Sequence, residues 1–247
     1  RQHLQKILGL VQIFLVEFPK LCHLARIFLR MKIRTEVEFQ EYVDSDLGWR
    51  KKEITEIMAF LKFSQLSEST ILRISIPIFY AHFEGFTKNI CNALTIYLNY
   101  QNYKYSEFSC SMSSLLLKRK FKNIDVSKKN SSFLKLNSFV RDGTDIIKFS
   151  KNSFLTYSNL TWKTFEDIMI TLGFEMGEID TYKIKSQKID SLVKLRNDIA
   201  HGKRIPVNKD IFIEFKELTI YCMDTLKDHF DLYLQNKSFL EEKMVIM

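Results

Sequence analysis

Three residues near the end of one predicted helix have side chains suited to chemistry at a phosphate group: Arg196, Asn197 and His201. A guanidinium keeps its charge and can donate to two phosphate oxygens at once. An imidazole can transfer protons near neutral pH. The spacing of the arginine and the histidine is a weak signal by itself, and an ordinary alternative stays open. In that alternative the histidine satisfies the last carbonyls of its helix, and the arginine pairs with a nearby carboxylate.

The flanking sequence predicts that this helix ends at His201. Apolar residues recur at near-helical spacing at Ile184, Ile189, Leu192, Leu195 and Ile199. Gly202 and Pro206 follow closely, and both residue types favour the end of a helix. A long last helix should begin after Asn208, which is a good N-cap residue. The reactive residues therefore lie at a helix end, just before a connecting loop.

The composition predicts an all-α fold. Seven Gly and three Pro in 247 residues are too few for the turns of a many-stranded sheet. We expect a central buried helix over 71–100, kinked or loosened by Pro77 and Gly85. Residues 36–63 predict two helices or one helix kinked near Gly48. Ser69 or Thr70 could cap the central helix, and a helix over 161–172 should end at Gly173.

The segment from about 101 to 160 predicts an irregular insertion with short helices, because it is rich in Lys, Asn and Ser. Residues 101–165 contain twelve Lys and Arg against four Asp and Glu, an excess that equals the formal net charge of +8. Such a basic region is a candidate contact for a polyanion. For an RNA backbone the candidates are Lys118, Arg119 and Lys120, although any one of them could be an ordinary solvated lysine or arginine.

Several function classes lack their motifs. The sequence contains no G-x-x-x-x-G-K-[ST], no G-x-G-x-x-G and no G-x-S-x-G, so nucleotide hydrolysis, dinucleotide binding and serine hydrolysis are excluded. His82 and Glu84 match half of a zinc-deaminase motif, but no P-C-x-x-C follows. Because the five histidines are far apart and no carboxylates cluster, we expect neither a metal nor another cofactor.

The four cysteines, at 22, 91, 110 and 222, form no C-x-x-C pair, which favours a reducing cytoplasm. The longest N-terminal apolar run, residues 7–16, is too short to span a bilayer, so we expect no membrane span. Met31 opens a charged stretch that is typical of a natural protein start. Residues 1–30 would then be an extension, helical at most, and residues 31–247 the working domain.

The full string around the reactive residues, IDSLVKLRNDIAHG, is more specific than the spacing alone. It resembles the R-x(4-6)-H motif of the HEPN superfamily, including the polar residue after the arginine and the Ala-His-Gly ending. The strings IPIFYAHFEGFTKNICNALTIYL and DLGWRKKEI resemble a stand-alone branch of HEPN nucleases from bacterial toxin and defence loci. The resemblance covers roughly residues 31–100 and 160–235, and the insertion between them matches nothing.

The resemblance implies a helical bundle, and homodimers that join two motifs to cut RNA without a metal. Attack by the ribose 2′-hydroxyl would give a 2′,3′-cyclic phosphate and a 5′-hydroxyl. His201 would transfer the proton, while Arg196 would supply the positive charge beside the phosphate. Such an endoribonuclease would be a toxin or an antiviral defence effector, with a cognate antitoxin or defence protein as a further partner. The alternatives are a non-catalytic HEPN module that binds RNA or a protein, and a purely structural dimerisation unit.

Helical geometry indicates a composite site. At about 100° per residue, Arg196 and His201 lie about 140° apart around the helix, whereas Asn197 and His201 lie about 40° apart. Either Arg196 reaches around the helix, or a two-fold axis supplies a second histidine. We expect a homodimer whose groove contains both copies of Asn197 and His201, with Arg196 at its flank. Asn197 would orient the phosphate or the imidazole, or simply cap backbone, and Asp198 should face away.

Two further sets of residues could support this site. Tyr80 and Glu84 share a face of the central helix, although Glu84 and Lys88 have the spacing of a simple ion pair. Lys203 and Arg204 would extend the positive surface along which the RNA backbone lies. Related toxins that are paired with nucleotidyltransferase antitoxins carry a modified tyrosine two residues after the histidine. That position is Lys203 here, so we do not expect control by tyrosine AMPylation.

Overall fold

The computed structural model describes residues 32–63, 66–127, 130–150, 153 and 159–241. The chain divides into two compact units, Arg1–Ile33 and Arg34–Met247. The expectations for residues 1–30, Met31 and Cys22 lie outside the described residues. The fold below is that of the second unit.

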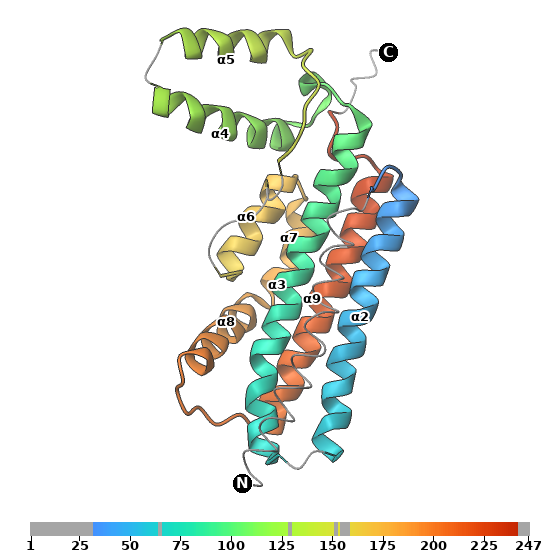
Figure 1. The fold of residues 1–247 in the computed structure, drawn as a ribbon, viewed down its shortest axis with the longest axis vertical. Helices are drawn as coiled ribbons and strands as arrows, with labels where there is room; N and C mark the ends of the chain where they lie inside the picture. Colours follow the sequence, from blue (N-terminus) through green and yellow to red (C-terminus); the bar gives the residue numbers. More distant parts are fainter. Residues whose placement is uncertain (1–31, 64–65, 128–129, 151–152, 154–158, 242–247) are drawn as a thin grey trace, which may run out of the picture. The chain divides into compact units, whose positions relative to one another are not determined.

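The described part of the second unit is helical, which confirms the predicted all-α class (Figure 1). Its α-helices are α2 (Glu36–Phe63), α3 (Glu68–Gln101), α4 (Cys110–Ser127), α5 (Asn130–Asp142), α6 (Trp162–Leu172), α7 (Met176–Lys183), α8 (Ser186–Ala200) and α9 (Lys209–Gln235), and a 3-10 helix, η1, covers Tyr105–Glu107. The only β pairing among these residues is two isolated bridges, Lys104 with Ile146 and Phe108 with Leu240. None of the described helices is both long and apolar enough to cross a membrane.

Helix α3 is the centre of the bundle, as the sequence predicts. It packs against α2, α8 and α9, and 17 of its 34 residues are buried. Pro77 and Gly85 lie within the helix but do not divide it. Its N-cap is Ser67, whose hydroxyl accepts from the N–H of Thr70, so the expected caps at Ser69 or Thr70 are wrong by two or three residues.

Other expectations about helix ends have mixed outcomes. Gly173, at φ 85°, ends α6 as predicted, and the side chain of Asn208 caps α9 by accepting from the N–H of Ile211. Helix α2 is continuous through Gly48, so neither a break nor two helices is found. No Cβ contact limits Gly48, and the apolar face that α2 buries against α3 and α9 runs on both sides of it. The short helix α7 was not expected, because its sequence lacks a clear apolar period.

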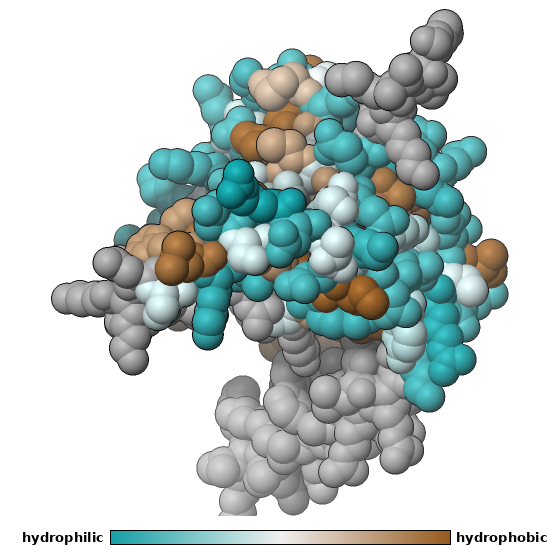
Figure 2. All heavy atoms as spheres, turned by 90° about the horizontal axis from the view of Figure 1, so that it is seen from above, coloured by the Kyte–Doolittle hydropathy of each residue, from teal (hydrophilic) through white to brown (hydrophobic). Residues whose placement is uncertain are grey.

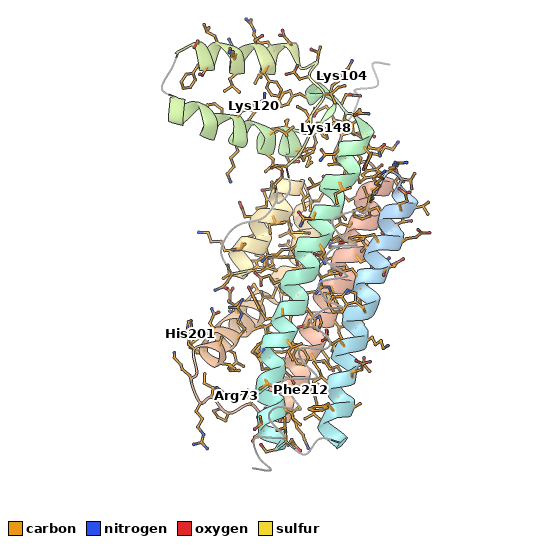
Figure 3. All side chains as sticks on the ribbon, viewed as in Figure 1. Arg73, Lys104, Lys120, Lys148, His201 and Phe212 are labelled. Carbon is orange, nitrogen blue, oxygen red and sulfur yellow. The ribbon has the colours of Figure 1, made fainter. Side chains whose placement is uncertain are left out.

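The insertion is more regular than the sequence predicts. It forms a hairpin of two helices, α4 and α5, of 18 and 13 residues. Helix α4 packs against α6, and among the described helices α5 has its main contacts with α4. The surface seen from this end of the unit is mostly hydrophilic, with separate hydrophobic patches (Figure 2). The basic side chains of Lys104, Lys120 and Lys148 lie at the same end (Figure 3).

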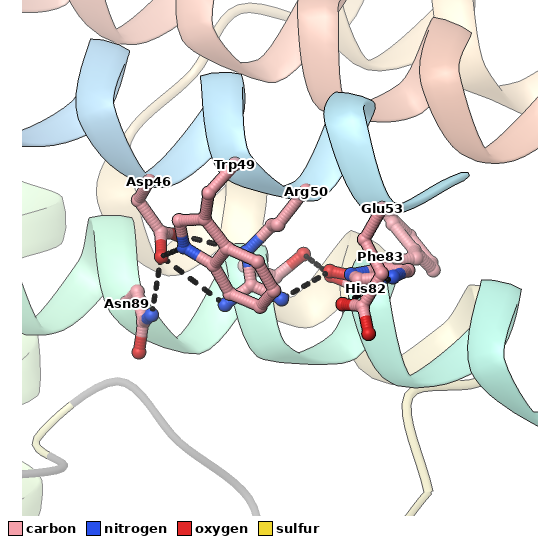
Figure 4. Close-up of polar contacts among 8 residues, drawn as sticks. Asp46, Trp49, Arg50, Glu53, His82, Phe83 and Asn89 are labelled. Atoms are coloured by element: carbon pink, nitrogen blue, oxygen red, sulfur yellow. Dashed lines mark hydrogen bonds and ion pairs between the residues drawn. The ribbon is translucent and has the colours of Figure 1, made fainter. Parts of the chain in front are cut away.

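A buried polar network joins α2 to α3 (Figure 4). Arg50 and Asp46 form an ion pair of 2.9 Å with side chains only 6% and 2% exposed. Asp46 also accepts from Trp49 and Asn89, and Arg50 donates to the carbonyl of His82. A Cβ on Gly85 would lie 2.8 Å from Arg50 Nη1. The glycine in the middle of α3 is therefore explained by the close approach of a buried guanidinium rather than by a kink.

Candidate functional site

Backbone geometry places His201 at the exposed end of α8. His201 is the C-cap, and Gly202 follows at φ 80°, a left-handed conformation that suits glycine. The N–H of Gly202 donates to Ile199 and the N–H of Lys203 donates to Asp198, both at 3.0 Å, which is the Schellman pattern. The last carbonyls of α8 are therefore satisfied by backbone donors. The imidazole makes no hydrogen bond to any described residue, so the capping role in the ordinary alternative is not observed.

Three neighbours hold the guanidinium of Arg196. Its central carbon lies over the Tyr80 ring, 4.1 Å from the ring centroid. Nη1 donates to Oδ1 of Asn197 at 2.6 Å, and Nη2 lies 3.9 Å from Oε2 of Glu84. The side chain keeps 26% of its surface exposed. The guanidinium is thus fixed by stacking and by polar contacts, yet it remains accessible to a ligand.

Glu84 has a stronger partner than Arg196. Its Oε1 accepts from Nζ of Lys88 at 2.8 Å, which confirms the expected ion pair within α3. The carboxylate of Glu84 lies 3.9 Å from Nη2 of Arg196 but 2.8 Å from Nζ of Lys88, a difference of 1.1 Å. Because Lys88 takes most of the pairing, Glu84 orients Arg196 without fully neutralising it. The ordinary alternative, in which the arginine pairs with a nearby carboxylate, is therefore observed only as a long contact between Arg196 and Glu84.

Tyr80 links the site to the segment before α6. It is 1% exposed, and its hydroxyl accepts from the backbone N–H of Leu160 at 2.8 Å. Burial raises the pKa of this phenol, and the nearby Glu84 carboxylate raises it further, so it stays protonated. The ring therefore serves as a neutral platform beneath Arg196. The structure brings Tyr80, Glu84, Arg196 and Asn197 together, and His201 lies one helical turn beyond Asn197.

The remaining motif residues contact side chains at this helix end. Asn197 contacts Arg196 rather than capping backbone. Asp198, expected to face away, pairs with Lys203 at 2.6 Å, and this contact is the main reason why the pKa of its carboxyl is lowered.

The loop after His201 is tied to α3 by a residue that the sequence did not single out. Nη2 of Arg73 donates to the backbone carbonyl of Lys203 at 2.8 Å across 130 positions of sequence. The side chains of Lys203 and Arg204 are exposed, as a backbone-binding role requires. No local pattern distinguishes Arg73 from other surface arginines, so only the fold could reveal its contact with the loop.

The other basic candidates are separated from this helix end. Lys118 and Lys120 lie on α4, and Lys120 Nζ lies 3.6 Å from the centroid of the Phe139 ring. The side chain of Arg119 is outside the described residues. Lys120 and His201 lie toward opposite ends of the unit (Figure 3). The sequence could not show this separation, which follows from the course of α3 between the two regions.

The described residues contain no group of three His, Cys, Asp or Glu side chains that could hold a metal ion. His82 and Glu84, the half motif noted above, point to different neighbours. His82 is buried beside Trp49 and Glu53, and burial lowers its pKa to about 4, whereas Glu84 faces Lys88 and Arg196. The two side chains therefore do not form one site.

Comparison with protein-family models matches residues 39–239 to the family described as HEPN_MAE_28990-like HEPN. The match covers well over half of the chain, so the chain belongs to this family and to the HEPN superfamily. HEPN domains are generally associated with ribonucleases. No curated protein and no solved structure matches the chain.

Proposed function

We propose that this chain is a metal-independent endoribonuclease that cleaves RNA by attack of the ribose 2′-hydroxyl. The observation that carries the proposal is the combination of a fixed but accessible Arg196 and an exposed His201 at one helix end of a HEPN domain, the imidazole having no hydrogen-bond partner among the described residues. Arg196 would donate to the phosphate oxygens as their negative charge grows. His201 would transfer a proton to or from the reacting oxygens.

The complete site would contain two chains. The reaction needs both a base for the 2′-hydroxyl and an acid for the departing 5′-oxygen, and one motif offers a single imidazole. Ile74 and Ala81 are exposed on one face of α3, and Ala81 lies about 60° around the helix from Glu84, so two apolar side chains border the motif. We propose that a second copy packs there and brings its own Asn197 and His201 into the same groove.

The biological setting that fits this activity is a cytoplasmic toxin or antiviral defence effector, restrained by an antitoxin or partner protein. Residues 31–247 would suffice for activity, with residues 1–30 as an extension. The second candidate function is a non-catalytic HEPN module that binds RNA or a protein through the same helix end. The exposed Arg204 beside His201 favours RNA as that ligand, together with Lys203, which RNA would draw from its ion pair with Asp198.

The experiment is incubation of RNA with the protein in excess EDTA. Wild type should cleave RNA and leave matching DNA intact. His201→Ala should lower the rate by about 100-fold or more, and Arg196→Ala by a similar factor. Arg34→Ala is the matched control, because Arg34 also lies over a tyrosine ring, that of Tyr100, and should keep full activity. RNA binding without cleavage, unchanged in His201→Ala, would select the non-catalytic alternative.

A further inference from the structure

The described cations of the α4–α5 hairpin form no ion pair with a described carboxylate. Elsewhere in the unit, surface lysines pair with carboxylates, as Lys51 does with Asp224 and Lys188 with Glu214. No ion pair among the described residues involves any residue of 101–165, although this segment holds the excess of Lys and Arg. Lys118, Lys135 and Arg141 are all exposed. The described part of the hairpin therefore presents three exposed cations that no described carboxylate neutralises.

Aromatic side chains are exposed on the same hairpin. Phe121 of α4 is 51% exposed and Phe133 of α5 is 48% exposed, values that a folded core does not explain. Lysines together with exposed aromatic rings are the combination that binds single-stranded nucleic acid, through backbone charge and through stacking of bases. The phosphates of a nucleic acid would pair with the cations of the hairpin, and its bases would stack on the two phenylalanine rings.

The arrangement around α5 favours RNA over a lipid surface. At about 100° per residue, Asn137 and Arg141 lie between Phe133 and Leu134 on the helix circumference, whereas Val140, 42% exposed, lies about 20° from Phe133 on its other side. A helix that lies in a membrane interface instead separates an apolar face from a charged face. Seen from this end of the unit, the hydrophobic side chains form separate patches bordered by hydrophilic ones rather than one apolar face (Figure 2). On one side, the Phe133 ring thus has polar neighbours suited to a sugar-phosphate chain.

The hairpin is distant from the motif. Arg196 stacks on Tyr80, and the hairpin begins after α3 ends at Gln101. At about 1.5 Å per residue, that length of helix corresponds to about 30 Å. A stacked strand advances about 3.4 Å per nucleotide, so a strand would need roughly 10 nucleotides to reach both regions. Short oligonucleotides can therefore engage only one of them.

We propose that the α4–α5 hairpin is a second RNA-binding surface, which selects long single-stranded RNA over short oligonucleotides. The inference rests on the proposed RNA cleavage, for which the hairpin would hold the substrate at a distance from the scissile phosphate. Lys118, Lys135 and Arg141 contact phosphates, and Phe121 and Phe133 stack on bases. None of these residues is part of the reactive site, so the hairpin sets substrate affinity and leaves the chemical step unchanged.

Fluorescence anisotropy measures the binding of a 40-nucleotide unstructured RNA and of a 5-nucleotide RNA. The full chain carries His201→Ala in every experiment, so that the RNA stays intact. The triple variant K118Q/K135Q/R141Q removes three cations. Each phosphate contact on a single strand contributes about 0.7 to the slope of log K against log salt, so the slope should fall by about 2. At 0.1 M salt, this means about 100-fold weaker binding of the long RNA, with little change for the short one.

Two controls match these variants. K52Q/K183Q/K188Q removes three exposed lysines from the bundle, with the same change of net charge, and should bind the long RNA like the parent. Phe121→Ala and Phe133→Ala should each weaken binding about 5-fold or more, whereas Leu134→Ala, at a 69% exposed aliphatic residue, should not.

Three outcomes would overturn the proposal: equal losses in both lysine triples, equal losses for the long and the short RNA, and binding to anionic phosphatidylserine vesicles in place of RNA. The test is separate from that of the proposed function. A wild-type protein that fails to cleave, with hairpin-dependent RNA binding intact, refutes the nuclease but not the hairpin surface. Normal cleavage and binding of the long RNA by the hairpin variants refutes only the hairpin surface.

Discussion

Replacing Asp46 with asparagine should destabilise the protein by about 3–5 kcal/mol, the usual consequence of leaving a buried charge without its partner. In the folded chain this carboxylate accepts from Nε of Arg50 at 2.9 Å, from Trp49 at 2.9 Å and from Asn89 at 3.0 Å. Asparagine keeps the shape, but it removes the charge and turns one acceptor into a donor. The guanidinium of Arg50, with 6% of its side chain exposed, cannot reach water instead.

The assay is urea unfolding followed by circular dichroism, with the thermal midpoint as a second measurement. For a domain of this size, 3–5 kcal/mol corresponds to a fall of roughly 6–20 °C. A double variant, D46L/R50M, removes both charges and should recover most of the lost stability, because an apolar pair does not require a buried cation. A loss below about 1 kcal/mol in Asp46→Asn, or a double variant as unstable as the single one, would refute this reasoning.

Four further predictions follow from individual contacts. Burial lowers the pKa of His82 to about 4, whereas an unfolded histidine titrates near 6.5, so the unfolded chain binds the extra proton at a higher pH than the folded chain. The free energy of unfolding should therefore fall by about 3 kcal/mol as the pH drops from 6.5 to 4. Urea titrations of His82→Phe should not show this part of the fall. Gly202→Ala should cost about 1–2 kcal/mol in urea unfolding from left-handed strain alone, since no atom lies within 4 Å of the added Cβ; an unchanged midpoint would contradict this. Tyr80→Phe keeps the ring beneath Arg196 but leaves the N–H of Leu160 unpaired, so about 1–3 kcal/mol of stability should be lost while RNA cleavage stays within a few-fold of wild type. Ala81→Arg, an exposed change between two good helix formers, should leave the fold stable but yield monomers in analytical ultracentrifugation and abolish cleavage; an active dimer would exclude the proposed interface.

Much of the helical framework could be predicted from the sequence because its determinants are local. Gly173 and Asn208 mark helix ends through backbone conformation and capping, which depend only on neighbouring residues. The end of α8 at His201 could be predicted for the same reason, from Gly202. Helix α3 could be recognised by the length of its apolar pattern. Contacts with distant residues do not change these local features in the folded chain.

The predictions from the sequence are wrong where the local structure depends on contacts with residues far away in the chain. Gly85 was read as a point of weakness in α3, but its lack of a side chain admits Arg50, which lies 35 positions earlier. Gly48 does not break α2, because burial against the rest of the bundle outweighs the low helix propensity of one glycine. The insertion is predicted to be irregular with short helices, but its helices have 18 and 13 residues, and they pack against α6 and each other.

In the candidate site too, the sequence indicated the residues, whereas their contacts depend on the fold. The motif string indicated Arg196, Asn197 and His201, and the spacing of α3 indicated Tyr80 and Glu84 as neighbours. The stacking of Arg196 on Tyr80, the division of Glu84 between two cations and the contact of Arg73 with the loop all depend on how α3 and α8 cross. The variants of Arg196, His201 and Tyr80 described above test the functional roles predicted for these residues.

The most direct test of the central claim is the chemistry of the ends that the protein leaves on RNA in excess EDTA. The products of the wild-type protein, resolved by mass spectrometry and by labelling with polynucleotide kinase, should carry 2′,3′-cyclic phosphates and 5′-hydroxyls. Products with 3′-hydroxyls and 5′-phosphates, or cleavage that stops when divalent cations are removed, would contradict a mechanism in which Arg196 and His201 act through the ribose hydroxyl alone.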